Sequence, residues 1–346
     1  MGHYGLAPWP LVPLDPISPP DFRAERECSL LLHEIRKVVL MYSMVISSLF
    51  PVFALLFLGH LLKRFKLTND DFLKTSDRLI YFIFFPMLLF WKIGGADTGS
   101  GISWDLCLVG IIAIALIYLV SALALKMFTV SAFKAGTFSQ SCYRFNTYIG
   151  MAIVYNALGD EGVKHFGILI GLVIPFINVL AVSTLIWYSG ERIVFSQRIR
   201  VTLREIVTNP LIIGCLTGLL YARFINRFPA FLDNAFSLSA AVALPLALIS
   251  IGGALTMKSL KGNLRLSMVA AVIKLLFLPV VGYFLLGFFQ VSGVPFKVGM
   301  IYFTLPASAS IYVLSAQLNS DTELASAAIV LSTILSFFSL TVGLIL

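Results

Sequence analysis

The sequence predicts an all-α polytopic membrane protein with ten transmembrane helices, arranged as two inverted five-helix repeats. Three observations support this fold class. Of all residues, 59% are hydrophobic and only 12% are charged, and the apolar runs have the length of about 20 residues that spans a bilayer. The chain matches itself when it is shifted by 159 positions. Each half also contains one apolar segment that is interrupted by polar residues or by proline.

Residues 1–43 differ from the rest of the chain. Six prolines occur in the first twenty positions, and a charged run, 22–28, follows them. This composition is typical of disorder, and the basic start, apolar centre and cleavage site of a signal peptide are missing. We therefore expect a disordered extension and a working protein that begins at Met41 or Met44. A regulatory tail is the alternative.

Ten apolar spans are expected after this extension. Their limits lie near 44–62, 77–94, 104–126, 137–157, 166–188, 209–225, 235–257, 266–289, 296–317 and 324–345. The odd-numbered loops contain fourteen Lys and Arg residues, whereas the loops on the opposite side contain five. Because basic loops stay in the cytoplasm, both ends of the ten-helix core are expected outside a cell inner membrane.

The internal repeat relates two halves of the chain, 44–188 and 209–346, which a cytoplasmic linker, 189–208, connects. The shift of 159 positions aligns Pro51 with Pro210, Gly59 with Gly218, Pro86 with Pro245 and Gly94 with Gly253. Five spans is an odd number, so the second half enters the membrane from the opposite side, as in many secondary transporters. Pro86 and Pro245 lie within spans, where proline bends a helix. They are expected to be hinges, or else tolerated kinks.

Two spans combine apolar length with residues that lipid disfavours. The fourth span begins with several polar side chains, which are costly in the membrane, and the ninth contains a proline followed by serines. If both helices break and cross, their half-helix N-termini attract an anion. The expected binding residues are Gln140, Arg144, Asn146, Thr147, Pro306, Ser308 and Ser310. Close helix packing is the alternative for the two serines.

Charged residues within the spans indicate the cargo. Arg144 and Lys274 either neutralise an acidic substrate or extend to the cytoplasmic edge of the membrane, and for Lys274 we prefer the second interpretation. No Asp or Glu lies near the middle of a predicted span, which disfavours a cation exchanger. Motifs of hydrolases and metal sites are missing. We therefore expect no enzyme activity, no metal, no cofactor and no nucleic-acid partner.

Several motifs resemble those of the auxin efflux carrier family, the bacterial and plant group that includes the PIN-type auxin exporters. The motifs are Asn146–Gly150 after Arg144, Pro51 with Gly59, Asn209–Gly214, Leu244–Gly253, Leu305–Ser310 and Leu331–Thr333. The resemblance covers 44–346. It implies a scaffold domain and a transport domain, broken fourth and ninth helices that cross, elevator movement of small organic anions, and often a homodimer.

The chain departs from the family pattern at Met151 and Ala152, where many relatives have a proline shortly after the glycine of the fourth helix. The break is therefore expected to depend on Asn146, Thr147 and Gly150. The expected function is secondary transport of a small carboxylate by alternating access, with proton coupling and potential-driven uniport both compatible with the sequence. The alternatives are a sodium-coupled organic anion symporter of the bile-acid type and a non-transporting membrane sensor.

Overall fold

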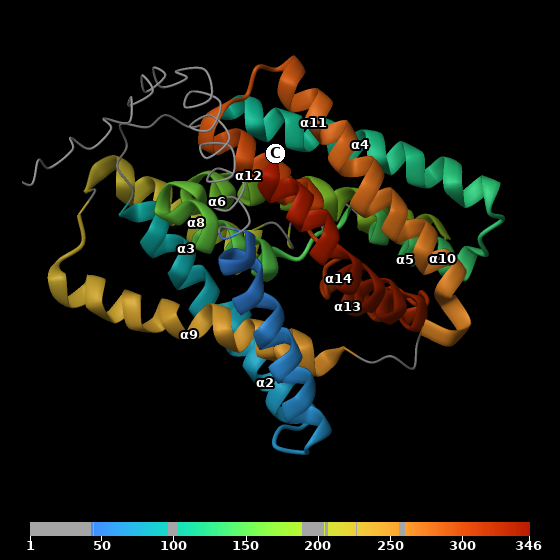
Figure 1. Cartoon of the computed structure of the whole chain (residues 1–346), viewed down its shortest axis with the longest axis horizontal. Coiled ribbons are helices and arrows are strands. Elements are labelled where there is room, and N and C mark those ends of the chain that lie inside the picture. Colours follow the sequence, from blue (N-terminus) through green and yellow to red (C-terminus); the bar gives the residue numbers. More distant parts are fainter. Residues whose placement is uncertain are drawn as a thin grey trace, which may run out of the picture. The chain divides into compact units, whose positions relative to one another are not determined.

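The structure is a computed structural model that describes residues 43, 45–95, 103–188, 204, 207–225, 227–255 and 260–346. Every regular element in these ranges is a helix (Figure 1), so the all-α prediction is confirmed for them. The predicted extension, except Ser43, and most of the predicted linker 189–208 lie outside the described residues.

Six helical segments in the described ranges are long and apolar enough to cross a membrane. They are Val45–Arg64, α4 (Trp104–Met127), Ala132–Tyr188, α9 (Ala230–Ala254), Gly262–Phe288 and α14 (Thr322–Ile345). A shorter apolar helix is α8 (Pro210–Phe224). Six is fewer than the ten predicted spans because the fourth and fifth spans lie together in Ala132–Tyr188. In addition, the second, sixth and ninth spans form short or interrupted helices.

Several of these segments are divided. The remaining elements are α2 (Asp70–Leu79), η1 (Ile80–Phe84), α3 (Phe85–Gly94), α5 (Ala132–Tyr143), α6 (Thr147–Tyr188), α10 (Leu260–Val272), η3 (Ile273–Phe277), α11 (Leu278–Phe288), α12 (Gly293–Thr304) and α13 (Ser310–Gln317). Helix α6 changes direction at Gly159, where φ is 62°, a conformation that glycine adopts readily. This point lies between the predicted fourth and fifth spans.

Two prolines explain the two π-helical turns. The turn η1 ends two residues before Pro86, and η3 ends two residues before Pro279. A proline ring collides with the carbonyl group four residues earlier in a regular α-helix, and the wider π-turn relieves that collision. Pro245 lies inside α9 without a π-turn. Pro86 and Pro245 therefore match in sequence but differ in local structure.

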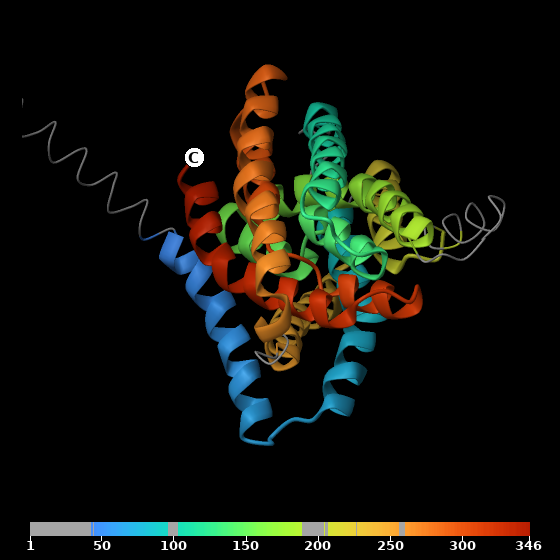
Figure 2. The same ribbon diagram turned by 90° about the vertical axis from the view of Figure 1, so that its right-hand side faces the viewer.

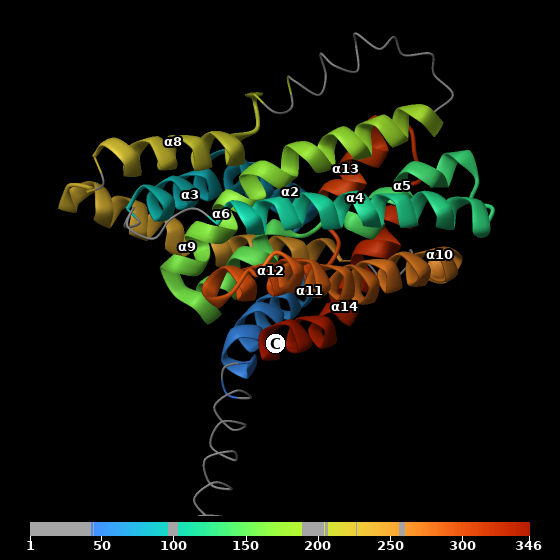
Figure 3. The same ribbon diagram turned by 90° about the horizontal axis from the view of Figure 1, so that it is seen from above.

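One group of helices consists of Val45–Arg64, α3, α8 and α9, and glycines allow their backbones to touch. Helix α3 packs against α8 and α9, and Figure 3 shows α3 and α8 side by side. A Cβ atom on Gly214 would lie 2.7 Å from the carbonyl oxygen of Pro86. A Cβ atom on Gly252 would lie 2.7 Å from the carbonyl carbon of Leu56. Small residues permit such close approach between membrane helices.

The second group consists of α4, α5, α6 and the segments from α10 to α14. Within it, α10 packs against α14, and α12 packs against α6 and α14. Figure 2 shows α11, in orange, beside α4, in teal, and the two helices are in contact. Helix α6 also contacts α3, α8 and α9. The two groups therefore meet through α6, and also where Phe53 of Val45–Arg64 meets Phe337 of α14 edge-on.

Candidate functional site

Two helices are interrupted in the same way. Helix α5 ends at Tyr143 and α6 begins at Thr147, whereas α12 ends at Thr304 and α13 begins at Ser310. The first residue of each interruption is extended, with φ −68° and ψ 140° at Arg144 and φ −66° and ψ 146° at Leu305. We call residues 144–146 the first break and residues 305–309 the second break.

Different residues cause the two breaks. Pro306 forces the residue before it out of the α-helical region, so α12 ends at this point. In the first break, Asn146 acts as the N-cap of α6, because its Oδ1 accepts hydrogen bonds from the N–H groups of Tyr148 (3.1 Å) and Ile149 (3.2 Å). Asparagine is among the preferred N-cap residues. The first break therefore forms without a proline.

Gly150 lies inside α6 and not in the first break. Its N–H group donates a helical hydrogen bond of 3.0 Å to the carbonyl oxygen of Asn146. The prediction that Gly150 belongs to the break is therefore wrong. The residue instead permits close packing, because a Cβ atom at this position would lie 2.6 Å from the Leu305 side chain of the second break and 2.6 Å from the Phe166 ring.

The two breaks are in direct contact. The N–H group of Asn146 donates a hydrogen bond of 2.9 Å to the carbonyl oxygen of Pro306. The ring of Phe145 meets the ring of Tyr302 edge-on, with 4.7 Å between their centroids. The second break is also tied to α14, because the N–H group of Ala307 donates to Ser332 Oγ at 3.0 Å. We call this meeting point the crossing.

The amide of Asn146 has a free donor at the crossing. The residue is only 2% exposed, and its Nδ2 group has no hydrogen-bond partner among the described residues. A buried donor without a partner costs about 1–3 kcal/mol, so a ligand that accepts this hydrogen bond recovers that cost. Thr147 is half-buried beside Asn146, and Pro306 is buried on the facing break. The structure thus brings these three predicted residues together.

The two predicted serines lie where α13 begins, and they contact each other. Ser308 is half-buried and Ser310 is exposed, and their Oγ atoms are 2.8 Å apart. Ser308 Oγ also accepts the N–H group of Ser310 at 3.3 Å. The pair stabilises the start of α13, and its exposed side is accessible to a ligand.

Gln140 and Arg144 belong to a buried polar network behind the crossing. The Arg144 guanidinium donates to Gln140 Oε1 at 3.3 Å and to Asn178 Oδ1 of α6. Gln140 Nε2 donates to Ser315 Oγ of α13 at 3.0 Å, and Ser315 in turn lies 2.7 Å from Thr137 Oγ1. Arg144 is 8% exposed, so it does not extend to the membrane edge. These side chains hold α5 against α6 and α13.

Sequence reasoning underestimated Lys274 and missed Tyr302. Both side chains are fully buried, and neither Lys274 Nζ nor the Tyr302 hydroxyl has a hydrogen-bond partner in the described part of the chain. Lys274 Nζ lies 6.0 Å from the centroid of the Phe145 ring in the first break. The interpretation that Lys274 extends to the membrane edge is therefore wrong. Pro279 could have indicated the unusual position of Lys274, because the π-turn that precedes this proline contains the lysine.

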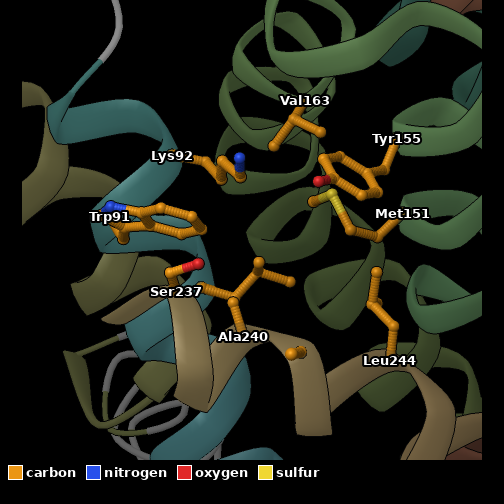
Figure 4. A pocket seen from close by; sticks show the side chains of 10 residues that line it. Trp91, Lys92, Met151, Tyr155, Val163, Ser237, Ala240 and Leu244 are labelled. Atoms are coloured by element: carbon orange, nitrogen blue, oxygen red, sulfur yellow. The ribbon is translucent and has the colours of Figure 1, made fainter. Parts of the chain in front are cut away.

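A cavity of about 130 Å³ lies between α3, α6 and α9. Figure 4 shows Trp91 and Lys92 of α3 on one side, Met151 and Tyr155 of α6 on another, and α9 below them. Met151 lies one turn after the start of α6, so the cavity extends to the helix that Asn146 caps. Its lining is mainly apolar, with Lys92 as its charged residue.

Lys92 is held at the wall of this cavity. Its Nζ atom donates to Asp160 Oδ1 at 2.7 Å and lies 4.1 Å from the Trp91 ring centroid and 5.0 Å from the Tyr155 ring centroid. Trp91 Nε1 donates to Asp233 Oδ1 of α9 at 2.6 Å. A cation between aromatic rings is held electrostatically. These contacts connect α3 to both α6 and α9 at one end of the cavity.

The described residues contain no group of three or more His, Cys, Asp or Glu side chains that could hold a metal ion. Cys107, Cys142 and Cys215 are buried free thiols. Near the crossing, the buried polar atoms without a hydrogen-bond partner in the described part of the chain include Asn146 Nδ2, the Tyr302 hydroxyl and Lys274 Nζ.

Comparison with known proteins agrees with a membrane location and a transport role. The family model described as membrane transport protein matches residues 44–344. The chain belongs to this family. The resemblance to the auxin efflux carriers is thereby confirmed, and the family is one of transporters rather than enzymes.

Two relatives of this membrane transport protein are archaeal. An uncharacterized transporter of Methanocaldococcus jannaschii is 22% identical over 293 residues, which cover 82% of this chain and 93% of the relative. An uncharacterized transporter of Methanothermobacter thermautotrophicus is 23% identical over 300 residues, which cover 85% of this chain and 95% of the relative. The chain is therefore a multi-pass membrane transport protein. The names of these relatives give no cargo, so the cargo has to be inferred from the candidate site.

Proposed function

We propose that this membrane transport protein is a secondary carrier of a small organic anion, a carboxylate, which binds at the crossing. The observation that carries the proposal is the buried Asn146 Nδ2 group without a partner. Helices α6 and α13 both begin at the crossing, and the N-terminus of a helix has a partial positive charge. Donors and positive helix ends favour an anion over a cation.

The proposal includes the architecture of ten transmembrane helices in two inverted repeats. A Cβ atom on Gly59 would lie 2.8 Å from the carbonyl carbon of Ile249, and one on Gly218 would lie 3.2 Å from the carbonyl oxygen of Phe90. The shift of 159 positions converts Gly59 to Gly218 and Phe90 to Ile249. These two contacts are therefore each other's counterparts, as expected for helices related by a two-fold axis.

The same shift relates the two breaks, because it aligns Thr147 with Pro306. In this proposal the scaffold is formed by Val45–Arg64, α2–α3, α8 and α9. The crossing moves with α6 and its neighbours against that scaffold in an elevator-type cycle. The cavity beside Lys92 lies on the boundary between these two parts, where a substrate has to pass. The protein would reside in a cell inner membrane, with both ends of the ten-helix core outside.

A ligand screen of the purified protein tests this assignment. Acetate, benzoate, malonate and malate are added to wild type, and the apparent melting temperature is measured, because ligand binding stabilises the folded state. Asn146→Ser is the informative variant, since serine retains an oxygen that can cap α6 but lacks the amide donor. We expect one or more acids to stabilise wild type, and the stabilisation to be lost in Asn146→Ser.

Asn209→Ser is the matched control. Asn209 is also buried and also caps a helix, because its Oδ1 accepts from the N–H groups of Leu211 (2.9 Å) and Ile212 (3.4 Å) at the start of α8. This variant should keep the ligand response of wild type. Equal stabilisation of Asn146→Ser and wild type would show that the anion binds elsewhere.

Two alternatives make different predictions in the same assay and in transport. A sodium-coupled symporter of the bile-acid type requires sodium for both binding and uptake, whereas the proposed carrier does not. A non-transporting sensor binds the acid but moves none across the membrane. The proposed carrier does both.

A further inference from the structure

The amine of Lys274 is buried without a partner, and the contacts between the two breaks do not explain this position. The residue lies in the π-turn η3, is 0% exposed, and has no hydrogen-bond partner for Nζ in the described part of the chain. π-turns occur frequently at functional sites. The described residues therefore offer this amine neither a hydrogen-bond acceptor nor a carboxylate counter-ion.

The surroundings of Lys274 contain few groups that could neutralise its charge. The turn η3 packs against α4, α5, α10, α11, α12 and α14. Within the described residues of these helices, the titratable group that interacts with the amine is the Cys142 thiol of α5, and no carboxylate does so. Tyr302 of α12 packs edge-on against the Phe145 ring, and the same ring lies near Lys274 Nζ.

Phe145 connects the amine to the crossing. The ring lies 6.0 Å from Lys274 Nζ, within the distance at which an aromatic ring attracts a cation. The backbone of Phe145 lies between Arg144 and Asn146, so the ring is fixed to the break that carries the free amide donor. An anion at Asn146 and a charge on Lys274 would therefore be close enough to attract each other in a medium of low dielectric constant.

An isolated ammonium group is costly in a buried site, and the cost falls when an opposite charge arrives. We propose that Lys274 is the proton-binding group of the carrier and makes it a proton–anion symporter. The amine takes one proton from water, becoming –NH₃⁺, as the anion enters the crossing, and returns the proton to water as –NH₂ when the anion leaves. This inference rests on the proposed function, and it names the coupling ion that the sequence left open.

Proton uptake on ligand binding tests the inference. The acid from the panel of acetate, benzoate, malonate and malate that stabilises wild type most is added at mildly alkaline pH, where these acids are ionised and the amine of the unliganded protein is mostly neutral. The solution is weakly buffered and contains a pH indicator dye. Wild type should take up close to one proton for each anion bound. Lys274→Met should take up none and should bind the anion at least tenfold more weakly.

Two further variants separate charge from structure. Lys274→Arg should bind the anion without proton uptake, because the guanidinium stays protonated. Ser267→Ala is the control, since Ser267 on α10 also has a fully buried polar atom without a partner and carries no charge. It should behave as wild type. Without ligand, Lys274→Met should melt no lower than wild type, because methionine has similar length and no buried amine, whereas a merely structural role would lower its melting temperature.

The results distinguish the two proposals. If wild type binds the anion without proton uptake, or if Lys274→Met still takes up a proton, the inference about Lys274 is wrong and the proposed function stands. If wild type binds none of the acids, the proposed function is wrong and the inference falls with it.

Discussion

Replacement of Gly252 by alanine should destabilise the protein, because its helix touches the backbone of a neighbour. A Cβ atom here would overlap the Leu56 carbonyl oxygen and lie 2.7 Å from the carbonyl carbon. Backbone cannot rotate away as a side chain can, so α9 and Val45–Arg64 would have to separate. Overpacking of this kind costs about 1–3 kcal/mol, partly offset by a gain of about 1 kcal/mol from the higher helix propensity of alanine.

A graded series makes this reasoning quantitative. At Gly150 the nearest atoms to an added Cβ belong to side chains, and at Gly287 no atom lies within 4 Å. The propensity gain is common to all three alanine variants, so their differences report the clash alone. Gly252→Ala should melt lowest, Gly150→Ala next and Gly287→Ala highest. Since about 1 kcal/mol corresponds to about 2–4 °C in a large domain, a clash of about 1–3 kcal/mol should make Gly252→Ala melt at least about 2 °C below Gly287→Ala.

Thermal unfolding of the purified variants in detergent provides the measurement. Equal melting temperatures for Gly252→Ala and Gly287→Ala would refute the backbone contact between α9 and Val45–Arg64. The Gly59–Ile249 contact, on which the proposed two-fold relation depends, joins the same two helices, so this result would also weaken the inverted-repeat architecture.

Three other substitutions test separate contacts. Asn178→Ala removes the amide oxygen that accepts from the buried Arg144 guanidinium; since hydrogen bonds to charged groups contribute about 1.5–3 kcal/mol, its melting temperature should fall by several degrees. Ala240→Leu fills part of the cavity between α3, α6 and α9; it should leave the stability of the protein and the ligand-induced shift in melting temperature nearly unchanged but lower the uptake of the acid into proteoliposomes. Asp321→Ala removes an N-cap of α14, whose Oδ1 accepts from the N–H group of Leu324 at 2.9 Å, and should cost about 1 kcal/mol. Asp321→Asn keeps that cap and should melt close to wild type, because the ion pair to Lys134 is long, at 3.6 Å, and that lysine also donates to Asn263 Oδ1 at 2.8 Å.

Local chemistry made much of the fold predictable. Apolar length alone indicated membrane helices, and Pro306 correctly marked the second break because a residue before proline avoids the helical region. The first break was harder to place, since Asn146 ends one segment and caps the next. Propensity does not show whether an asparagine caps a helix or faces a ligand, and here one side chain presents both an engaged oxygen and a free amide.

Long-range contacts were not predictable from the sequence. Arg144 and Gln140 are close to Asn146 in the chain, yet their side chains turn to Asn178 and Ser315 on other helices. The prediction for Lys274 was wrong because it relied only on the position of the residue along its span. Its position one third along an apolar span suggested that it could reach the membrane edge, but the π-turn before Pro279 places it in the interior. Tertiary packing decided each of these cases.

Uptake into proteoliposomes tests the central claim most directly. Wild type and Asn146→Ser are reconstituted, and uptake of the radiolabelled acid that stabilises wild type is followed with and without sodium. We expect saturable uptake by wild type that does not require sodium, and uptake by Asn146→Ser reduced at least tenfold, with Asn209→Ser close to wild type. Binding of the acid by wild type without any uptake above empty liposomes would contradict the claim that this protein is a carrier.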